Sequence, residues 1–256
     1  MSLLHAFILG VVEGVTEFLP ISSTAHLALS SKLLGLTQSE FIKSFEISIQ
    51  FGAILSVVVL YGKMVFRSWK IIKKIMLSFI PTAIIGFLLY GIIKNVLLSS
   101  YSVMVWSLLI GGIILIIFEL FYKEKSEGAG DIAEISNVKC FAIGTFQALA
   151  VIPGVSRAAA TITGGLLLGI KRKTITEFSF ILAVPTMLAA GGYDLLKAGS
   201  SFGSDDYLAI LVGFVVSFIV AIVAIKFLIS YVQRNNFIPF GIYRIVLAIV
   251  FIIFLL

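Results

Sequence analysis

Two acidic residues near the start of the chain, Glu13 and Glu17, are spaced so that one face of a helix would carry both. Carboxylates this close repel each other unless a cation lies between them, and hard oxygen donors of this kind suit Mg²⁺ or Ca²⁺. We therefore expect Glu13 and Glu17 to hold a divalent cation or to act directly in catalysis. The alternative is that they pair with Arg157, an arginine of a second polar cluster, or take up protons.

Hydroxyl groups, a histidine and an arginine accompany the two acids. The hydroxyl residues are Ser22, Ser23, Thr24 and Ser156, the histidine is His26 and the arginine is Arg157. A guanidinium offers a planar fork of donors that fits two phosphate oxygens. A cation bridge, a hydroxyl nucleophile, an imidazole and an arginine are together the parts that phosphoryl transfer requires. The serines alone would also suit helix caps. Gln50 is a further candidate to line the cavity that these residues would form, and to bind substrate.

Each polar cluster interrupts an apolar stretch, 3–34 or 140–170, at a proline. Because Pro20 and Pro153 each remove a backbone hydrogen bond and clash with the preceding turn, each stretch is expected to form two half-helices that meet at a break. The half-helices that follow the breaks would begin near the membrane midplane, where their free N–H groups and positive dipole ends attract anions. Ionisable residues and irregular backbone are costly at that depth, so they indicate function.

The composition places these breaks in a bilayer. Of 256 residues, 60% are hydrophobic and 12% are charged, about half the charged fraction of a soluble domain. Six further segments are long and apolar enough to span a membrane: 44–62, 76–94, 103–122, 176–193, 208–231 and 237–256. We therefore predict an all-α polytopic membrane protein, in which residues 1–256 form a single integral membrane domain with six transmembrane helices and two re-entrant helix-break-helix hairpins.

The net charge of +6 does not indicate nucleic-acid binding, because the cations cluster between apolar runs, at 63–74 and 171–173. Such clusters are typical of cytoplasmic loops. With both clusters inside the cell, the hairpin at 140–170 enters the membrane from the cytoplasmic side and the hairpin at 3–34 enters from outside. The same orientation places the N- and C-termini outside.

The two broken stretches resemble each other. Pro20 and Pro153 lie 133 residues apart, as do Ser23 and Ser156, and each break is followed by a leucine-rich half-helix that ends in Leu-Leu-Gly. With the orientation given above, the sequence predicts an inverted-topology repeat whose halves are 1–122 and 140–256. Inverted repeats with broken helices are also typical of secondary transporters, so a transporter or lipid-phosphate flippase is the competing prediction.

The run from Glu13 to His26, EGVTEFLPISSTAH, resembles the first signature of the bacterial undecaprenyl-pyrophosphate phosphatases, which are membrane enzymes associated with bacitracin resistance. The segment PGVSR at 153–157 resembles their second signature, and the segments 45–54 and 177–185 are also similar to that family. The chain departs from the family pattern at two places. The usual Ser-Arg-Ser-Gly reads Ser-Arg-Ala-Ala at 156–159, and the usual Thr-Gly-His reads Thr-Ala-His at 24–26.

The resemblance implies a hydrolase of the bacterial cytoplasmic (inner) membrane that converts undecaprenyl (C55) diphosphate to the monophosphate and so recycles the lipid carrier of cell-wall synthesis. It implies dependence on a divalent cation, with Glu13 and Glu17 at the metal or catalytic centre, and it implies that Ser23, His26 and Arg157 act on the diphosphate. We expect Arg157 to clamp the phosphates and Ser23 to be the nucleophile, with His26 as its base. A phosphohistidine at His26 and attack by metal-activated water are the alternatives. Association into a homodimer is left open.

Overall fold

The computed structural model describes residues 1–37, 39–98, 100–123, 128–198 and 204–255, and the side chains among them except those of 194–198, 204–205 and 254–255. The elements are α1 (Leu3–Thr16), α2 (Ser23–Leu33), α3 (Glu40–Phe66), α4 (Trp69–Leu88), α5 (Tyr90–Ile92), the π-helix η1 (Ile93–Leu97), α6 (Tyr101–Phe121), the 3₁₀ turn η2 (Ile132–Glu134), α7 (Asn137–Ala148), the 3₁₀ turn η3 (Leu149–Val151), α8 (Arg157–Leu167), α9 (Arg172–Ala198), α10 (Ser204–Val232) and α11 (Ile238–Leu255). An isolated β-bridge pairs Ala129 with Ile170.

Five helices in the described part of the chain are long and apolar enough to cross a membrane. They are α3, α4, α6, α9 over Arg172–Tyr193, and α10 over Asp206–Val232. These helices confirm the expected all-helical, multi-pass architecture. The sixth expected span, 237–256, coincides with α11, which is a shorter apolar helix over Ile238–Ile253.

The basic segment 63–74, expected as a loop, is mostly helical. Helix α3 continues to Phe66 and α4 begins at Trp69, so Arg67 and Ser68 alone connect them. Lysine has a high helix propensity, and its aliphatic stem can lie along an apolar helix while the amine reaches water. The second span therefore begins at residue 69 rather than at the expected 76.

The two breaks share one backbone conformation. Ser22 and Ser156 are the non-glycine residues with positive φ in the described chain, at 71° and 73°, and non-glycine residues rarely adopt such angles. Each precedes an 11-residue helix, α2 or α8, and each of these helices is followed by a glycine with positive φ. The structural register therefore pairs Ser22 with Ser156 and Ser23 with Arg157, so the expected pairing of Ser23 with Ser156 is wrong by one residue.

One additional residue in the second break accounts for this shift. The proline of the first break precedes the positive-φ serine by two residues, whereas the proline of the second break precedes it by three. Gly154, with φ of 95°, lies in the longer break. A Cβ atom on Gly154 would approach the carbonyl oxygen of Met104 on α6 to 2.6 Å, so both the backbone angle and the close approach of α6 require glycine here.

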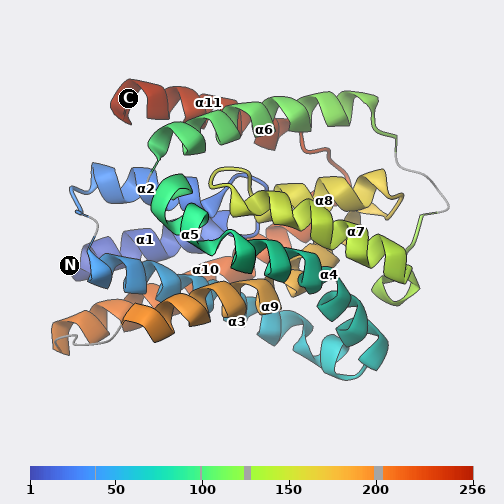
Figure 1. Ribbon diagram of the computed structural model, residues 1–256, viewed down its shortest axis with the longest axis horizontal. Coiled ribbons are helices and arrows are strands. Elements are labelled where there is room, and N and C mark those ends of the chain that lie inside the picture. Colours follow the sequence, from blue (N-terminus) through green and yellow to red (C-terminus); the bar gives the residue numbers. More distant parts are fainter. Residues whose placement is uncertain (38, 99, 124–127, 199–203, 256) are drawn as a thin grey trace.

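The breaks meet near the middle of the molecule. In Figure 1, α1 and α2 occupy the left half and α7 and α8 the right half, and the loops between the paired helices face each other at the centre. Helices α6 and α11 pack together above them, and α3 and α9 pack together below. Both chain termini lie at the left end (Figure 1).

Small residues hold α1 against α10. A Cβ atom on Gly10 would lie 2.7 Å from the carbonyl oxygen of Gly213, and one on Gly14 would lie 2.7 Å from the carbonyl oxygen of Ser217. In a bilayer, helices associate through such close backbone approach, because lipid offers no hydrophobic driving force between them. The glycines therefore fix the helix that carries Glu13 and ends just before Glu17.

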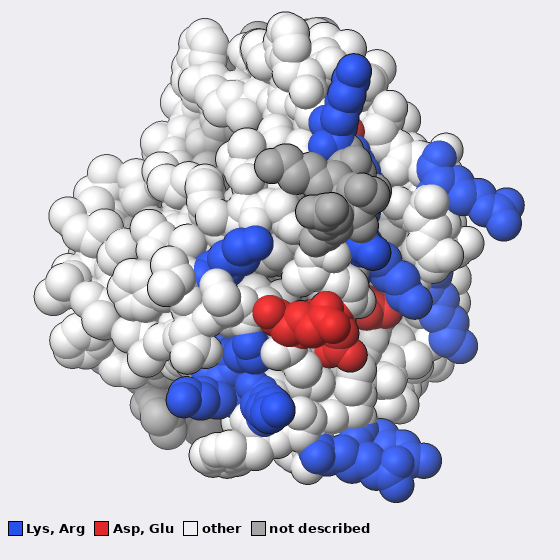
Figure 2. Space-filling model, turned by 90° about the vertical axis from the view of Figure 1, so that its right-hand side faces the viewer, with Lys and Arg blue, Asp and Glu red and all other residues white. Residues whose placement is uncertain are grey.

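Basic side chains gather at one end of the molecule. Figure 2 shows lysine and arginine side chains spread over the face at the right of Figure 1, where α3 and α6 end and α4 and α7 begin. Exposed basic residues at these helix ends and in the adjoining connections are Lys63, Arg67, Lys70, Lys73, Lys123, Lys173 and Arg234. The distribution matches the one that the positive-inside rule describes for a cytoplasmic face.

Candidate active site

Glu13 and Glu17 lie where α1 ends. Glu13 is on the last turn of the helix, and Glu17 follows the helix as its C-cap, with its backbone N–H bonded to the carbonyl oxygen of Glu13 at 3.0 Å. Both side chains are buried, with exposed fractions of 0% and 8%. The structure therefore places two carboxyl groups one helical turn apart in the interior.

The carboxylate of Glu17 joins the two breaks. Its Oε2 accepts a hydrogen bond of 2.5 Å from the hydroxyl of Ser23, the first residue of α2. Its Oε1 accepts a hydrogen bond of 3.2 Å from Nη2 of Arg157, the first residue of α8. Two polar clusters that are far apart in the sequence thus form one buried site.

Partners on α8 and α9 orient Arg157. Its Nη1 donates to the carbonyl oxygen of Ser179 at 2.7 Å and to the hydroxyl of Ser179 at 3.3 Å, and that hydroxyl lies 2.6 Å from the hydroxyl of Thr161. The ring of Phe18 lies 6.0 Å from the guanidinium carbon. Nε of Arg157 is buried with no hydrogen-bond partner among the described residues, so its N–H is a donor that a ligand could use.

His26 is buried in the first break, but the structure does not pair it with Ser23. Its Nδ1 lies 2.7 Å from the carbonyl oxygen of Ser22, and its Nε2 lies 2.7 Å from the hydroxyl oxygen of Tyr243 on α11. The hydroxyl of Ser23 bonds to Glu17 instead. In this geometry Glu17, rather than His26, is the group placed to accept the proton of Ser23.

The serines that precede the two half-helices differ in what their side chains do. The hydroxyl of Ser156 accepts a 3.2 Å hydrogen bond from the N–H of Ala159 and so caps α8, the commonest role for serine at this position. Ser22 makes no side-chain hydrogen bond to α2, so N–H groups in the first turn of α2 are available to an anion. Thr24, half-buried, lies in that first turn.

Gln50 lies on α3, half-buried and one turn beyond Glu46. Glu46 accepts a hydrogen bond of 3.3 Å from Ser31 on α2, and its charge lies within electrostatic range of Glu13. Helix α3 therefore contributes polar side chains next to α1 and α2. The expected contact between Gln50 and substrate stays a prediction.

Arg244 on α11 contacts both breaks, and we did not expect this role from the sequence. Its side chain is fully buried and donates to carbonyl oxygens of both breaks and of α6. The acceptors are Pro20 at 3.3 Å, Gly154 at 2.9 Å, Val155 at 2.8 Å, Ser107 at 3.0 Å and Leu108 at 3.4 Å. The sequence signal was an arginine within the apolar run 237–256, where an ionisable residue is costly and indicates function.

Comparison with known proteins decides the family. The family model described as bacitracin resistance protein BacA matches residues 6–250. The chain belongs to this family. A Persephonella marina protein named undecaprenyl-diphosphatase is 52% identical over 256 residues, which are all of both chains. Proteins of the same name from a Sulfurihydrogenibium species and from Aquifex aeolicus are 54% and 50% identical, over 98% of each chain.

The donors of this BacA-family site fit a divalent cation. Both carboxylate oxygens of Glu13 are buried and have no hydrogen-bond partner among the described residues, which is costly for an ionised group unless a cation compensates it. The described residues hold no group of three or more His, Cys, Asp or Glu side chains with metal-binding geometry. A Mg²⁺ or Ca²⁺ ion bound by Glu13 and Glu17 would therefore complete its coordination with substrate oxygens and water.

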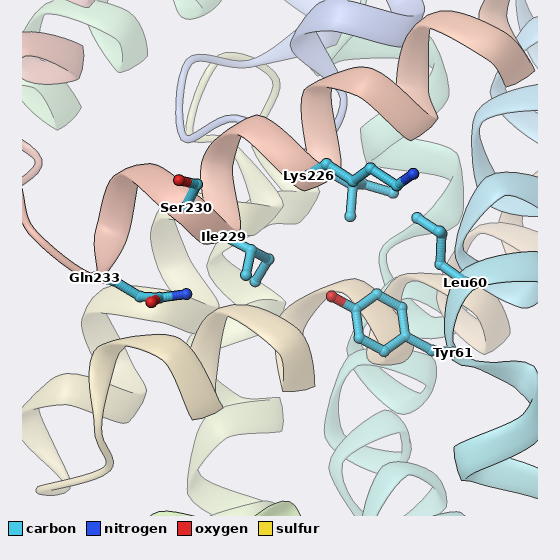
Figure 3. A pocket seen from close by; sticks show the side chains of 7 residues that line it. Leu60, Tyr61, Lys226, Ile229, Ser230 and Gln233 are labelled. Atoms are coloured by element: carbon cyan, nitrogen blue, oxygen red, sulfur yellow. The ribbon is translucent and has the colours of Figure 1, made fainter.

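A cavity of about 340 Å³ lies elsewhere in the BacA-family fold, between α3 and α10. Its lining consists of Leu60, Tyr61, Ile225, Lys226, Ile229, Ser230 and Gln233. Figure 3 shows the hydroxyl of Tyr61 and the amide of Gln233 pointing into it, while the amine of Lys226 extends away from Gln233. Because no residue of the breaks lines it, this cavity is not the phosphate site.

Proposed function

We propose that the protein hydrolyses undecaprenyl diphosphate to undecaprenyl phosphate and inorganic phosphate in the bacterial cytoplasmic membrane, and so returns the lipid carrier to cell-wall synthesis. The observation that carries this proposal is the Glu17 carboxylate, which is bonded to the Ser23 hydroxyl on one side and to the Arg157 guanidinium on the other. A nucleophile, a base and a phosphate clamp are thereby in one buried place. The relatives that match the chain over 98% or more of its length are named undecaprenyl-diphosphatase.

The diphosphate would bind between the N-terminus of α2 and Arg157. Hydrogen-bond donors are available from the first turn of α2 and from Nε of Arg157, and both suit the oxygens of a phosphate. The undecaprenyl chain would remain in the surrounding lipid. This pose sets the terminal phosphorus beside the hydroxyl of Ser23.

Ser23 would attack the terminal phosphorus while its proton passes to Oε2 of Glu17. The bond from the serine oxygen to phosphorus forms as the bond to the bridging oxygen breaks, and undecaprenyl phosphate departs with the electron pair. Arg157 stabilises the charge that develops on the phosphoryl oxygens. Water then hydrolyses the phosphoserine, which releases inorganic phosphate and restores the hydroxyl.

Glu13 and Glu17 would hold the divalent cation. Such an ion neutralises phosphate charge and supports the departing oxygen when it is bound. Because both imidazole nitrogens of His26 already have partners, the geometry favours Ser23 over a phosphohistidine at His26.

We infer the membrane topology from the arrangement of the helices and of the basic face. Helices α3, α4, α6, α9, α10 and α11 would be the six spans, with α1–α2 and α7–α8 as re-entrant hairpins of an inverted repeat, 1–122 and 140–256. The opposed hairpins and the shared backbone of their breaks support the repeat. The basic face would be cytoplasmic and both termini outside, so a reporter fused to the C-terminus that is active only in the cytoplasm would overturn this orientation. A homodimer stays a prediction.

The first experiment is phosphate release from C55 and C15 prenyl diphosphates by the purified protein in detergent, with Mg²⁺, Ca²⁺ or EDTA. We expect metal-dependent release that Glu17→Ala and Arg157→Ala abolish, and that Arg234→Ala at the exposed basic face leaves unchanged. Folded protein that binds the lipid diphosphate but releases no phosphate with any metal would refute the phosphatase and favour the transporter. Full activity in EDTA would refute the metal site alone.

A further inference from the structure

Both nitrogens of the His26 imidazole have defined partners. Nδ1 lies 2.7 Å from the carbonyl oxygen of Ser22, and Nε2 lies 2.7 Å from the hydroxyl oxygen of Tyr243. A carbonyl oxygen only accepts hydrogen bonds, so Nδ1 carries the proton of the neutral imidazole. Nε2 then has the lone pair, and the Tyr243 hydroxyl donates to it.

Tyr243 reaches His26 from a different element of the fold. It lies on α11, which packs on α6, while His26 lies on α2. The two rings are parallel, with an interplanar angle of 1° and centroids 5.5 Å apart. Tyr243 is 44% exposed and His26 is 8% exposed, so the tyrosine shields the imidazole from the surroundings of the protein.

The first break lacks a restraint that the second break has. In the second break, the hydroxyl of Ser156 caps α8 through the N–H of Ala159. In the first break, Ser22 makes no side-chain cap, although its backbone has the same unfavourable positive φ. A strained conformation persists only where the surrounding structure over-determines it, and the hydrogen bond from the His26 imidazole to the Ser22 carbonyl supplies that restraint.

We propose that Tyr243 is a positioning residue of the active site, holding His26 in the Nδ1–H tautomer and thereby fixing the backbone of Ser22. The next residue is Ser23, whose hydroxyl must stay 2.5 Å from Glu17. The Tyr243 hydroxyl bonds to His26, whereas the Ser23 hydroxyl bonds to Glu17, so Tyr243 acts through His26 and Ser22. This inference rests on the proposed phosphatase function and adds to it a residue from the last helix.

The kinetic test compares Tyr243→Phe with Tyr231→Phe, a control on α10 whose ring packs against Phe240 outside the site. The loss of one hydrogen bond to His26 should lower kcat for prenyl diphosphate about 5- to 10-fold. KM should stay within about twofold, because positioning acts on the reacting groups rather than on uniform substrate binding. Tyr231→Phe should match the wild type in both constants. An unchanged kcat in Tyr243→Phe would overturn the proposal.

A spectroscopic test is independent of hydrolysis. The chain has two histidines, His5 and His26, so a His5→Gln background labelled with ¹⁵N-histidine reports on His26 alone. We expect the Nδ1–H tautomer, and a shift of the Nε2 resonance when Tyr243→Phe removes its donor. An Nε2–H tautomer, or an Nε2 resonance unmoved by Tyr243→Phe, would overturn the proposal. If the protein released no phosphate, the proposed function would fail, and this measurement would still decide the contact.

Discussion

Replacing Arg244 with methionine is the perturbation for which the structure gives the largest expected effect on stability. Arginine has five N–H donors, and in Arg244 each of them meets a carbonyl oxygen of α6 or of a break. Hydrogen bonds inside membrane proteins average about 0.6 kcal/mol, and those in soluble proteins reach about 1.5 kcal/mol. Loss of all five in Arg244→Met should therefore cost about 3 to 8 kcal/mol of unfolding free energy.

The measurement is the unfolding free energy in mixed micelles, with Arg234→Met as the matched control because Arg234 is exposed beyond the end of α10. Arg244→Lys should lose less, because lysine keeps the charge and three donors but lacks the planar fork. Phosphate release should fall in both Arg244 variants, since neither methionine nor lysine has the five donors with which Arg244 bonds carbonyl oxygens of both breaks and of α6. An Arg244→Met variant within about 1 kcal/mol of the wild type, with unchanged release, would refute the claim that Arg244 holds the breaks together.

Three further predictions concern the site residues and an ion pair that supports the fold. Arg157→Lys should lower kcat on the order of 100-fold in a phosphate-release assay, because one amine cannot bond Glu17 and a phosphate as the fork does. Ser23→Ala should lower kcat about 1000-fold or more, and Ser22→Ala far less, since the Ser22 hydroxyl makes no cap; equal losses would contradict the assignment. Arg172→Met should cost about 3 to 5 kcal/mol in the same micelle unfolding measurement, because its two bonds to buried Glu119, at 2.5 and 2.7 Å, would be lost.

The sequence predicted the broken helices for a reason that was only partly right. Proline alone does not break a helix here, because Pro81 lies inside α4 and Pro185 inside α9 without ending either one. What distinguishes Pro20 and Pro153 is the positive-φ serine that follows each within three residues. A positive φ at serine depends on support from elsewhere in the fold: Tyr243 on α11 holds the His26 imidazole, which in turn bonds the Ser22 carbonyl, and local propensity cannot reveal this.

The residues of the candidate site were predictable where their type alone indicates chemistry. They were less predictable where their role depends on contacts across the fold. Glu13, Glu17, Ser23 and Arg157 are a set of side chains whose presence in an apolar chain already indicated function, and the structure brings Glu17, Ser23 and Arg157 into hydrogen-bond contact. The base expected for Ser23 was His26, because imidazole is the usual partner of a serine. That expectation could not include α11, whose side chains occupy one side of the break.

The corrected register between the two breaks explains why both are needed. The same backbone, a positive-φ serine before an 11-residue helix, presents Ser23 at the first position of α2 and Arg157 at the first position of α8. One position thus carries the proposed nucleophile in the first half and the proposed phosphate clamp in the second. Neither half contains both groups, so the reaction requires that the breaks face each other. Glu17 can bond to both residues only when the two breaks face each other.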